Sequence, residues 1–202
     1  MTESGTRRRG AALESAIFQA VWDEVSEGGY TRLSIESVAR RAGTGKAVLY
    51  RRWDGRVPLV LAAVQDNLPR QEDLADTGDL RDDLVKLLEA GAERVMTVGP
   101  RIIIGLLSEI LDQEGVDGEH FALLNDTILK HLRSLLDVVY ERAESRGELD
   151  RSAMSDQIAT LPLDIVRSHV LMQRPVTKDF LAEIVDDIVM PVLRSRCAPG
   201  RR

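Results

Sequence analysis

Basic and hydroxyl-bearing side chains gather between residues 44 and 56, where their donors could bind a polyanion. Lys46 can donate to a guanine edge or neutralise a phosphate, and the small Ala47 and Val48 permit close approach and apolar contact with a thymine methyl group. Four further side chains carry hydroxyl or guanidinium donors suited to phosphate oxygens: Tyr50, Arg51, Arg52 and Arg56. Contacts of that second kind would position the chain without reading sequence.

Two short helices must hold these side chains in place. Ser34 is suited to cap a first helix that carries apolar residues at helical spacing and ends at Gly43. Only residues 43–45 separate it from a second helix, predicted over Lys46–Trp53, so the two must cross steeply as a helix-turn-helix over residues 34–53. The first residues of the second helix would then lie at base edges: Thr44, Gly45, Lys46, Ala47 and Val48.

The opposite side of the second helix is predicted to pack on a core. Leu49 and Trp53 are one turn apart and would anchor it against Val38 and a preceding helix whose apolar stripe begins at Leu13. Upstream of that stripe, Arg7, Arg8 and Arg9 could reach a minor groove or phosphates, or form a solvated tail.

The residues from the capping serine to the aromatic residue carry a resemblance to a known family. They are Ser34-Ile35-Glu36-Ser37-Val38-Ala39-Arg40-Arg41-Ala42-Gly43, then Lys46, Leu49-Tyr50-Arg51 and Trp53. This pattern closely resembles the N-terminal domain of tetracycline-repressor (TetR) family regulators over about residues 10–66. The resemblance implies a homodimer that binds a palindromic operator in double-stranded DNA and is usually released by a ligand.

The resemblance also implies roles for individual residues. It places the family's phosphate contacts on Ser34, Tyr50, Arg52 and Arg56, and its base-reading positions on Lys46, Ala47 and Val48. Gly45 and Val48 stand where the family often has serine and threonine, so two hydroxyl contacts would be missing. The operator sequence therefore cannot be inferred from relatives.

Composition predicts an all-α fold. The 202 residues are 44% hydrophobic, 30% charged and only 4% aromatic, a mixture that favours helices and suffices for a core. We expect about nine helices in two domains: an N-terminal three-helix DNA-binding domain over residues 10–68, a polar linker, and a C-terminal helical ligand-binding and dimerisation domain over residues 79–196. Pro162 should kink one C-terminal helix, and Thr177 should cap the last.

Charge is unevenly distributed along the chain. The net charge is −6, yet residues 1–56 hold ten basic and seven acidic side chains, whereas the remainder holds 17 basic and 26 acidic ones. A basic head on an acidic body indicates that one end meets a polyanion. The single cysteine excludes an intrachain disulfide, and no apolar run is long enough to span a bilayer, so we expect a cytoplasmic protein that joins the nucleoid when bound to DNA.

The C-terminal half offers a wide apolar stripe over residues 177–193 that needs a partner surface. It could pack inside its own chain or, as the resemblance implies, form a four-helix bundle with a second copy. The residues expected at that dimer interface are Leu163, Val166, Val170, Phe180, Leu181, Ile184, Val185 and Ile188.

A ligand pocket is expected between the C-terminal helices, although residues of the kind proposed for its walls are more often plain core. The candidates are Met96, Ile103, Leu107, Leu124, Ile128, Val166 and His169, with His131 as another possible polar group. The scarcity of polar side chains among them favours an apolar effector. A regulator without an effector, or an activator, has the same sequence features.

Enzymatic chemistry finds no support in the residue pattern. His120 and His131 lie eleven residues apart on one predicted helix, about 16 Å, which is too far to share a metal. No nucleophile elbow, phosphate loop or zinc-binding helix motif occurs. We therefore expect no catalytic residue, no metal and no cofactor.

Overall fold

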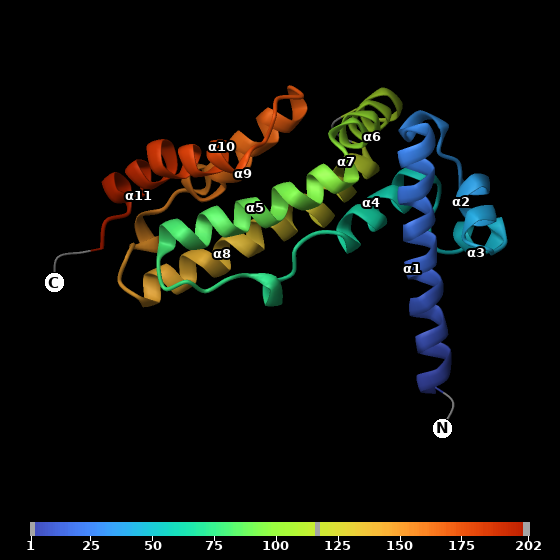
Figure 1. The fold of residues 1–202 in the computed structure, drawn as a ribbon, viewed down its shortest axis with the longest axis horizontal. Helices are drawn as coiled ribbons and strands as arrows, with labels where there is room; N and C mark the ends of the chain where they lie inside the picture. Colours follow the sequence, from blue (N-terminus) through green and yellow to red (C-terminus); the bar gives the residue numbers. More distant parts are fainter. Residues whose placement is uncertain (1–2, 116–117, 200–202) are drawn as a thin grey trace. The chain divides into compact units, whose positions relative to one another are not determined.

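The computed structural model describes residues 3–115 and 118–199, without the side chains of residues 3–9, 95–98, 100 and 101. Throughout this part of the chain every regular element is helical, which confirms the all-α prediction (Figure 1). None of these helices has the length and apolar character of a membrane span. The chain divides into two compact units: unit 1 comprises Met1–Asn67 and Arg101–Asn125, and unit 2 comprises Leu68–Pro100 and Asp126–Arg202.

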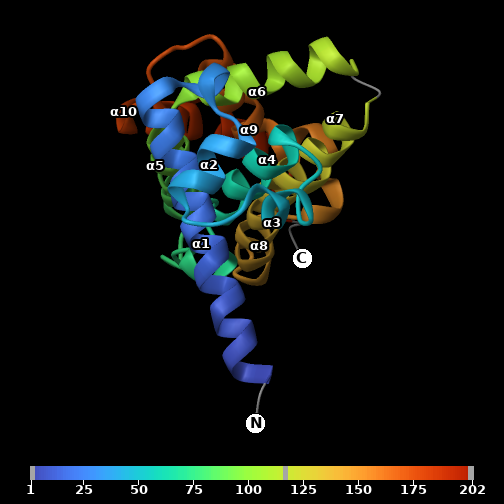
Figure 2. The same ribbon diagram turned by 90° about the vertical axis from the view of Figure 1, so that its right-hand side faces the viewer.

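Unit 1 contains the predicted helix-turn-helix. Its elements are α1 (Glu3–Gly28), a 3₁₀ turn (Tyr30–Arg32), α2 (Ile35–Arg41), α3 (Lys46–Tyr50), α4 (Arg56–Asp66), most of α6 (Pro100–Gln113) and α7 (Glu119–Leu124). Helix α2 packs against both α1 and α3, and α4 contacts α1 and α7. Figure 2 looks onto α2, α3 and α4. Residues 101–125, which we expected in the C-terminal domain, are grouped with the N-terminal helices.

The core of unit 1 follows the predicted apolar stripe of α1. Ile17 and Val21 are fully buried, together with Val38 of α2 and Leu59 of α4. The helix begins at Glu3, upstream of that stripe. The side chains of Arg7, Arg8 and Arg9 lie outside the described residues, so their proposed contact with DNA stays a prediction.

Unit 2 is built from long helices. Its elements are α5 (Leu80–Val98), α8 (Lys130–Ser145), α9 (Asp156–Leu171), α10 (Lys178–Ile184), α11 (Met190–Arg196) and two 3₁₀ turns (Gln71–Asp73 and Arg151–Ala153). A π-helical turn at Asn125–Leu129 joins α7 to α8, and another at Val185–Val189 joins α10 to α11. Counted as continuous helices, these elements bring the described chain to nine helices, as expected.

The core of unit 2 lies between α5, α8 and the last helices. Helices α5 and α8 pack side by side, and α10 packs on α5 (Figure 1). Tyr140 and Leu136 of α8 are fully buried there, beside Val185. As predicted, the Thr177 hydroxyl caps α10 by accepting a hydrogen bond from the Phe180 amide at 3.2 Å. Pro162 lies inside α9.

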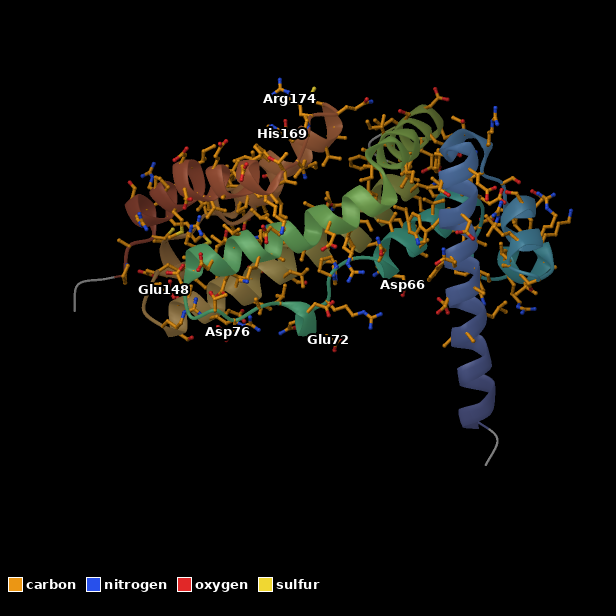
Figure 3. The ribbon with its side chains drawn as sticks, in the orientation of Figure 1. Asp66, Glu72, Asp76, Glu148, His169 and Arg174 are labelled. Atoms are coloured by element: carbon orange, nitrogen blue, oxygen red, sulfur yellow. The ribbon has the colours of Figure 1, made fainter. Side chains whose placement is uncertain are left out.

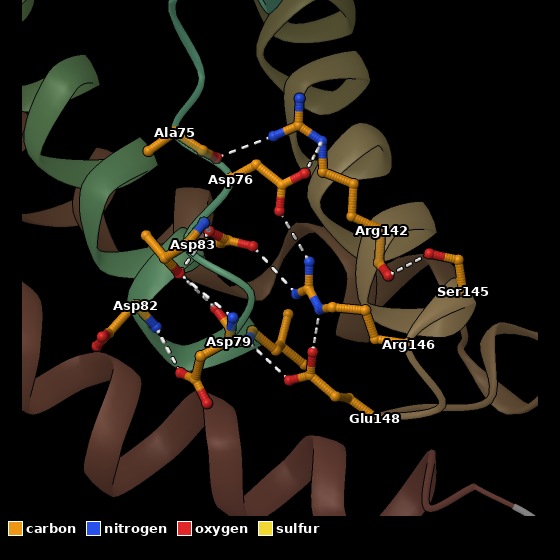
Figure 4. Close-up of polar contacts among 11 residues, drawn as sticks. Ala75, Asp76, Asp79, Asp82, Asp83, Arg142, Ser145, Arg146 and Glu148 are labelled. Carbon is orange, nitrogen blue, oxygen red and sulfur yellow. Dashed lines mark hydrogen bonds and ion pairs between the residues drawn. The ribbon is translucent and has the colours of Figure 1, made fainter.

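A charged network ties the linker before α5 to the end of α8 (Figures 3 and 4). Asp83, whose side chain is completely buried, accepts hydrogen bonds from the Thr77 amide at 2.7 Å and the Thr77 hydroxyl at 2.8 Å. The Arg146 guanidinium donates to Asp83 at 3.1 Å, to Asp76 at 3.1 Å and to Glu148. The predicted linker is therefore fastened to α8 at this point.

Candidate nucleic-acid interface

The cap of α2 and the glycine turn after it are those that the sequence predicted. The Ser34 hydroxyl accepts a hydrogen bond from the Ser37 amide at 3.1 Å, and the Ser37 hydroxyl accepts one from the Ser34 amide at 3.2 Å. Gly43 has a positive φ of 66°, a conformation that glycine adopts without steric cost. These local contacts fix where α2 begins and where the chain turns towards α3.

Helix α3 is anchored by one fully buried side chain. Leu49 is 0% exposed, and the Trp53 ring packs on Phe18 of α1 with ring centroids 5.7 Å apart. Both residues face the core, as predicted. Because Leu49 fixes the rotation of α3 about its axis, the residues on the other side must face solvent.

That exposed side carries the predicted base-reading residues. Gly45, Lys46 and Ala47 are exposed, while Thr44 and Val48 are half-buried. Tyr50 is 49% exposed, which is a high value for so large an aromatic side chain. The start of α3 therefore presents small residues and one lysine to solvent.

The basic side chains of this region fall into two groups. Among the described residues, Lys46 and Arg51 are exposed and their side chains make no hydrogen bond or ion pair, so both are available to an anion. Arg52 pairs with Glu14 at 3.2 Å, but both side chains are partly exposed. Such a surface pair contributes little stability, so Arg52 can exchange Glu14 for a phosphate at small cost.

Arg41 is held within the protein. Its guanidinium donates to Glu24 at 2.6 Å and to both oxygens of Glu27 at 2.8 and 2.5 Å, which ties α2 to α1. Hydrogen bonding to Arg41 is the main reason that the pKa of the Glu24 carboxyl is lowered. This role is not evident from sequence, because a run of charged residues does not show which of them meet across two helices.

Arg56, predicted as a phosphate contact, is occupied by partners inside unit 1. Its guanidinium donates to the Leu33 carbonyl at 3.1 Å and to the Glu109 carboxylate of α6 at 2.6 Å. It also lies 4.8 Å from the centre of the Tyr30 ring. The free protein therefore does not present this guanidinium as it presents Lys46 or Arg51.

The residues expected at a dimer interface divide by burial. Val170, Leu181, Ile184 and Val185 are buried inside the protomer, the last three within the core of unit 2, and have little surface left for a second copy. Leu163, Val166 and Phe180 are half-buried, and Ile188 is 40% exposed. Only this second group keeps apolar surface that a partner could cover.

The candidate pocket residues belong to both units. Ile103, Leu107 and Leu124 lie in unit 1 and are half-buried, whereas Ile128, Val166 and His169 lie in unit 2. The Met96 side chain lies outside the described residues.

The two histidines considered as polar groups for a ligand have partners within unit 2. The His169 ring, towards the end of α9 (Figure 3), stacks on Phe180 at 3.8 Å. His131 hydrogen-bonds through Nε2 to the Pro69 carbonyl at 2.8 Å. No group of three metal-ligating side chains occurs among the described residues.

An exposed lysine at the start of a short helix, held by a helix-turn-helix in an all-helical chain, is typical of a DNA-binding transcription regulator. Comparison with known proteins gives the family. Residues 17–63 match the model for bacterial regulatory proteins of the tetR family, and residues 74–188 match the model for the tetracyclin repressor-like C-terminal domain. The chain belongs to the tetR family.

Individual relatives agree with this assignment. An uncharacterized HTH-type transcriptional regulator of Mycobacterium tuberculosis is 31% identical over 84% of this chain and 82% of its own length. The DNA-binding transcriptional repressor TetR of Mycobacteroides abscessus is 26% identical over 96% of this chain and 98% of its own length. Among solved structures, the TetR family transcription regulator SCO0332 is 26% identical, with a TM-score of 0.68 over 88% of this chain and 97% of that chain.

Proposed function

We propose that this protein is a repressor that binds a palindromic operator as a homodimer and is released by a small, mostly apolar effector. The observation that carries the DNA-binding part is the exposed start of α3, where Lys46 has no partner among the described residues and Leu49 fixes the helix from behind. The full-length match to a relative named as a repressor supports the sign of regulation.

Gel shift with the intergenic DNA beside the protein's own gene, over a salt series, tests operator binding. A specific complex survives salt concentrations that remove non-specific contacts, because base contacts add to the salt-sensitive phosphate term. We expect a shift that disappears when one arm of the palindrome is scrambled. Equal affinity for scrambled and native DNA would contradict operator reading.

Two variants separate base reading from positioning. Lys46→Ala is expected to weaken binding and to relax base preference at one operator position, whereas Tyr50→Phe removes only a hydroxyl and should weaken all sites about equally. Selection of preferred sites from a randomised DNA pool measures both effects. A uniform loss in both variants would refute the base-reading role of Lys46.

The effector proposal rests on the apolar character of the candidate walls within unit 2, of which Ile128 is buried and Val166 is half-buried. A thermal-shift screen of apolar compounds tests it, because a ligand that binds only the native state raises the melting temperature. A hit must also release DNA in the gel shift. If no hit changes DNA binding, a regulator without an effector is favoured. If binding of the protein to its operator increases transcription, an activator is favoured.

A further inference from the structure

Three segments of unit 1 that are distant in sequence meet at a single carboxylate. One oxygen of Glu109, on α6, accepts hydrogen bonds from the Tyr30 hydroxyl at 2.5 Å and from the Arg56 guanidinium at 2.6 Å. Tyr30 is only 5% exposed, and the Glu109 side chain is 14% exposed. The contact therefore lies largely away from solvent, where a charge-assisted hydrogen bond is worth more than on the surface.

The sequence of α6 leaves room for this arrangement. Gly105 lies one turn before Glu109, and a Cβ atom at Gly105 would lie 2.9 Å from the Tyr30 ring, closer than real Cβ contacts come. Glycine thus lets the ring lie directly against the α6 backbone. Burial and the neighbouring Glu109 raise the pKa of Tyr30, so its hydroxyl stays protonated and donates.

The Arg56 guanidinium connects this contact to the helix-turn-helix. Arg56 is the first residue of α4, and it donates to the Leu33 carbonyl, one residue before the Ser34 cap of α2. The same guanidinium lies over the Tyr30 ring. One side chain thereby fixes the start of α2 and the start of α4 relative to α6.

We propose that Glu109, Tyr30 and Arg56 form a joint that positions the helix-turn-helix for DNA binding, so that Arg56 acts as a positioning residue and not as a phosphate contact. In this arrangement α6 helps to hold the helix-turn-helix in position through Glu109. The proposal rests on the proposed DNA-binding function, and it differs from the role that the family resemblance gives to Arg56. It is carried by two donors already occupied by protein acceptors.

Salt dependence of DNA binding distinguishes the two roles of Arg56. Each phosphate neutralised by a cation contributes about 0.9 to the slope of log affinity against log salt. Arg56→Gln is expected to weaken binding of the intergenic DNA about tenfold, within the usual range of coupling between sites, without changing that slope. Arg51→Gln, which removes an exposed and unpaired guanidinium, should lower the slope by about 0.9 per contact.

Glu109→Gln tests the other partner. The joint predicts weaker binding with an unchanged slope, and no further loss in the Arg56→Gln/Glu109→Gln double variant, because the two residues act through each other. Asp112→Asn, which changes an exposed carboxylate on the same helix, is the control and should bind as the parent does. Tighter binding with a steeper slope in Glu109→Gln would show that Glu109 competes with DNA for Arg56, and would overturn the proposal.

Hydrogen exchange without DNA separates this proposal from the proposed function. In Glu109→Gln, loss of the joint should speed hydrogen exchange at the amides of α2, whereas Asp112→Asn should leave this exchange unchanged. We expect the two variants to have equal melting temperatures. If the parent protein binds no DNA but α2 loses protection in Glu109→Gln, the joint exists and the proposed DNA-binding function is wrong. Unchanged protection in α2 would overturn the joint whatever the DNA result.

Discussion

Replacing Asp83 tests whether the buried charged network stabilises unit 2. Asp83→Ala removes two hydrogen bonds that Thr77 donates to a completely buried carboxylate, together with one of the three carboxylates around Arg146. Hydrogen bonds to a charged group contribute about 1.5–3 kcal/mol each. Arg146 keeps Asp76 and Glu148 and is not left unpaired, so we take the loss as the two Thr77 bonds at the lower end of that range, about 3 kcal/mol.

The neighbouring residue supplies a matched control. Asp82 has the same side chain in the same turn of α5, but it is half-exposed and pairs with Arg81 on the surface. Asp82→Ala should cost at most about 1 kcal/mol, as surface ion pairs do. Both changes introduce alanine into one helix, so differences in helix propensity largely cancel.

Thermal unfolding followed by circular dichroism gives the comparison. For a chain of this length, 1 kcal/mol corresponds to about 2–4 °C in melting temperature, so Asp83→Ala should melt about 6–12 °C below the parent. Asp82→Ala should remain within about 4 °C. If the two variants had the same melting temperature, the hydrogen bonds from Thr77 to the buried Asp83 carboxylate would contribute no net stability, and the reasoning from these contacts would be wrong.

Four other substitutions test three separate parts of the structure. Leu49→Ala, at a fully buried position, should destabilise the protein by about 2–5 kcal/mol in urea unfolding, and a smaller loss would place the anchor of α3 elsewhere. Ile188→Asp should give folded monomers by light scattering, whereas Ile184→Asp should unfold the buried core of unit 2; a folded Ile188→Asp dimer would exclude the interface. Because Arg41 lowers the pKa of Glu24, this ion pair stabilises the fold above about pH 4.5 and loses its effect as the pH falls through the lowered pKa. The melting temperature of Arg41→Gln should therefore differ most from that of the parent at neutral pH.

Local features of the DNA-binding unit were predictable because their signals lie within a few residues. The Ser34 cap, the turn at Gly43 and the buried Leu49 all depend on neighbours three or four positions away, which a periodic pattern records. The Glu109 contacts were not predictable in this way. Glu109 meets Arg56 and Tyr30 across 53 and 79 residues, and a glutamate in an apolar helix carries no sign of its partner.

The last helices show why the burial of individual residues in the apolar stripe could be predicted only in part from sequence. The apolar stripe over residues 177–193 was read with the spacing of an ideal α-helix. A π-helical turn at Val185–Val189 widens the helix and shifts the later residues around its axis. Ile184, before this turn, and Val185, at its start, are buried in the core of unit 2, while Ile188, within the turn, is exposed.

Not every basic side chain in the N-terminal region is available to DNA. Sequence counting treats every lysine and arginine alike, but Arg41 and Arg56 are held by protein carboxylates, and only Lys46 and Arg51 are both exposed and without partners in this part of α3 and its end. Salt dependence counts the cations that reach phosphates, at about 0.9 per contact. We therefore expect the slope of log affinity against log salt, per half-site, to lie near the number of these free side chains, with a contribution from Arg52. A much steeper slope would mean that the ion pairs between these arginines and the carboxylates on α1 and α6 break when DNA binds.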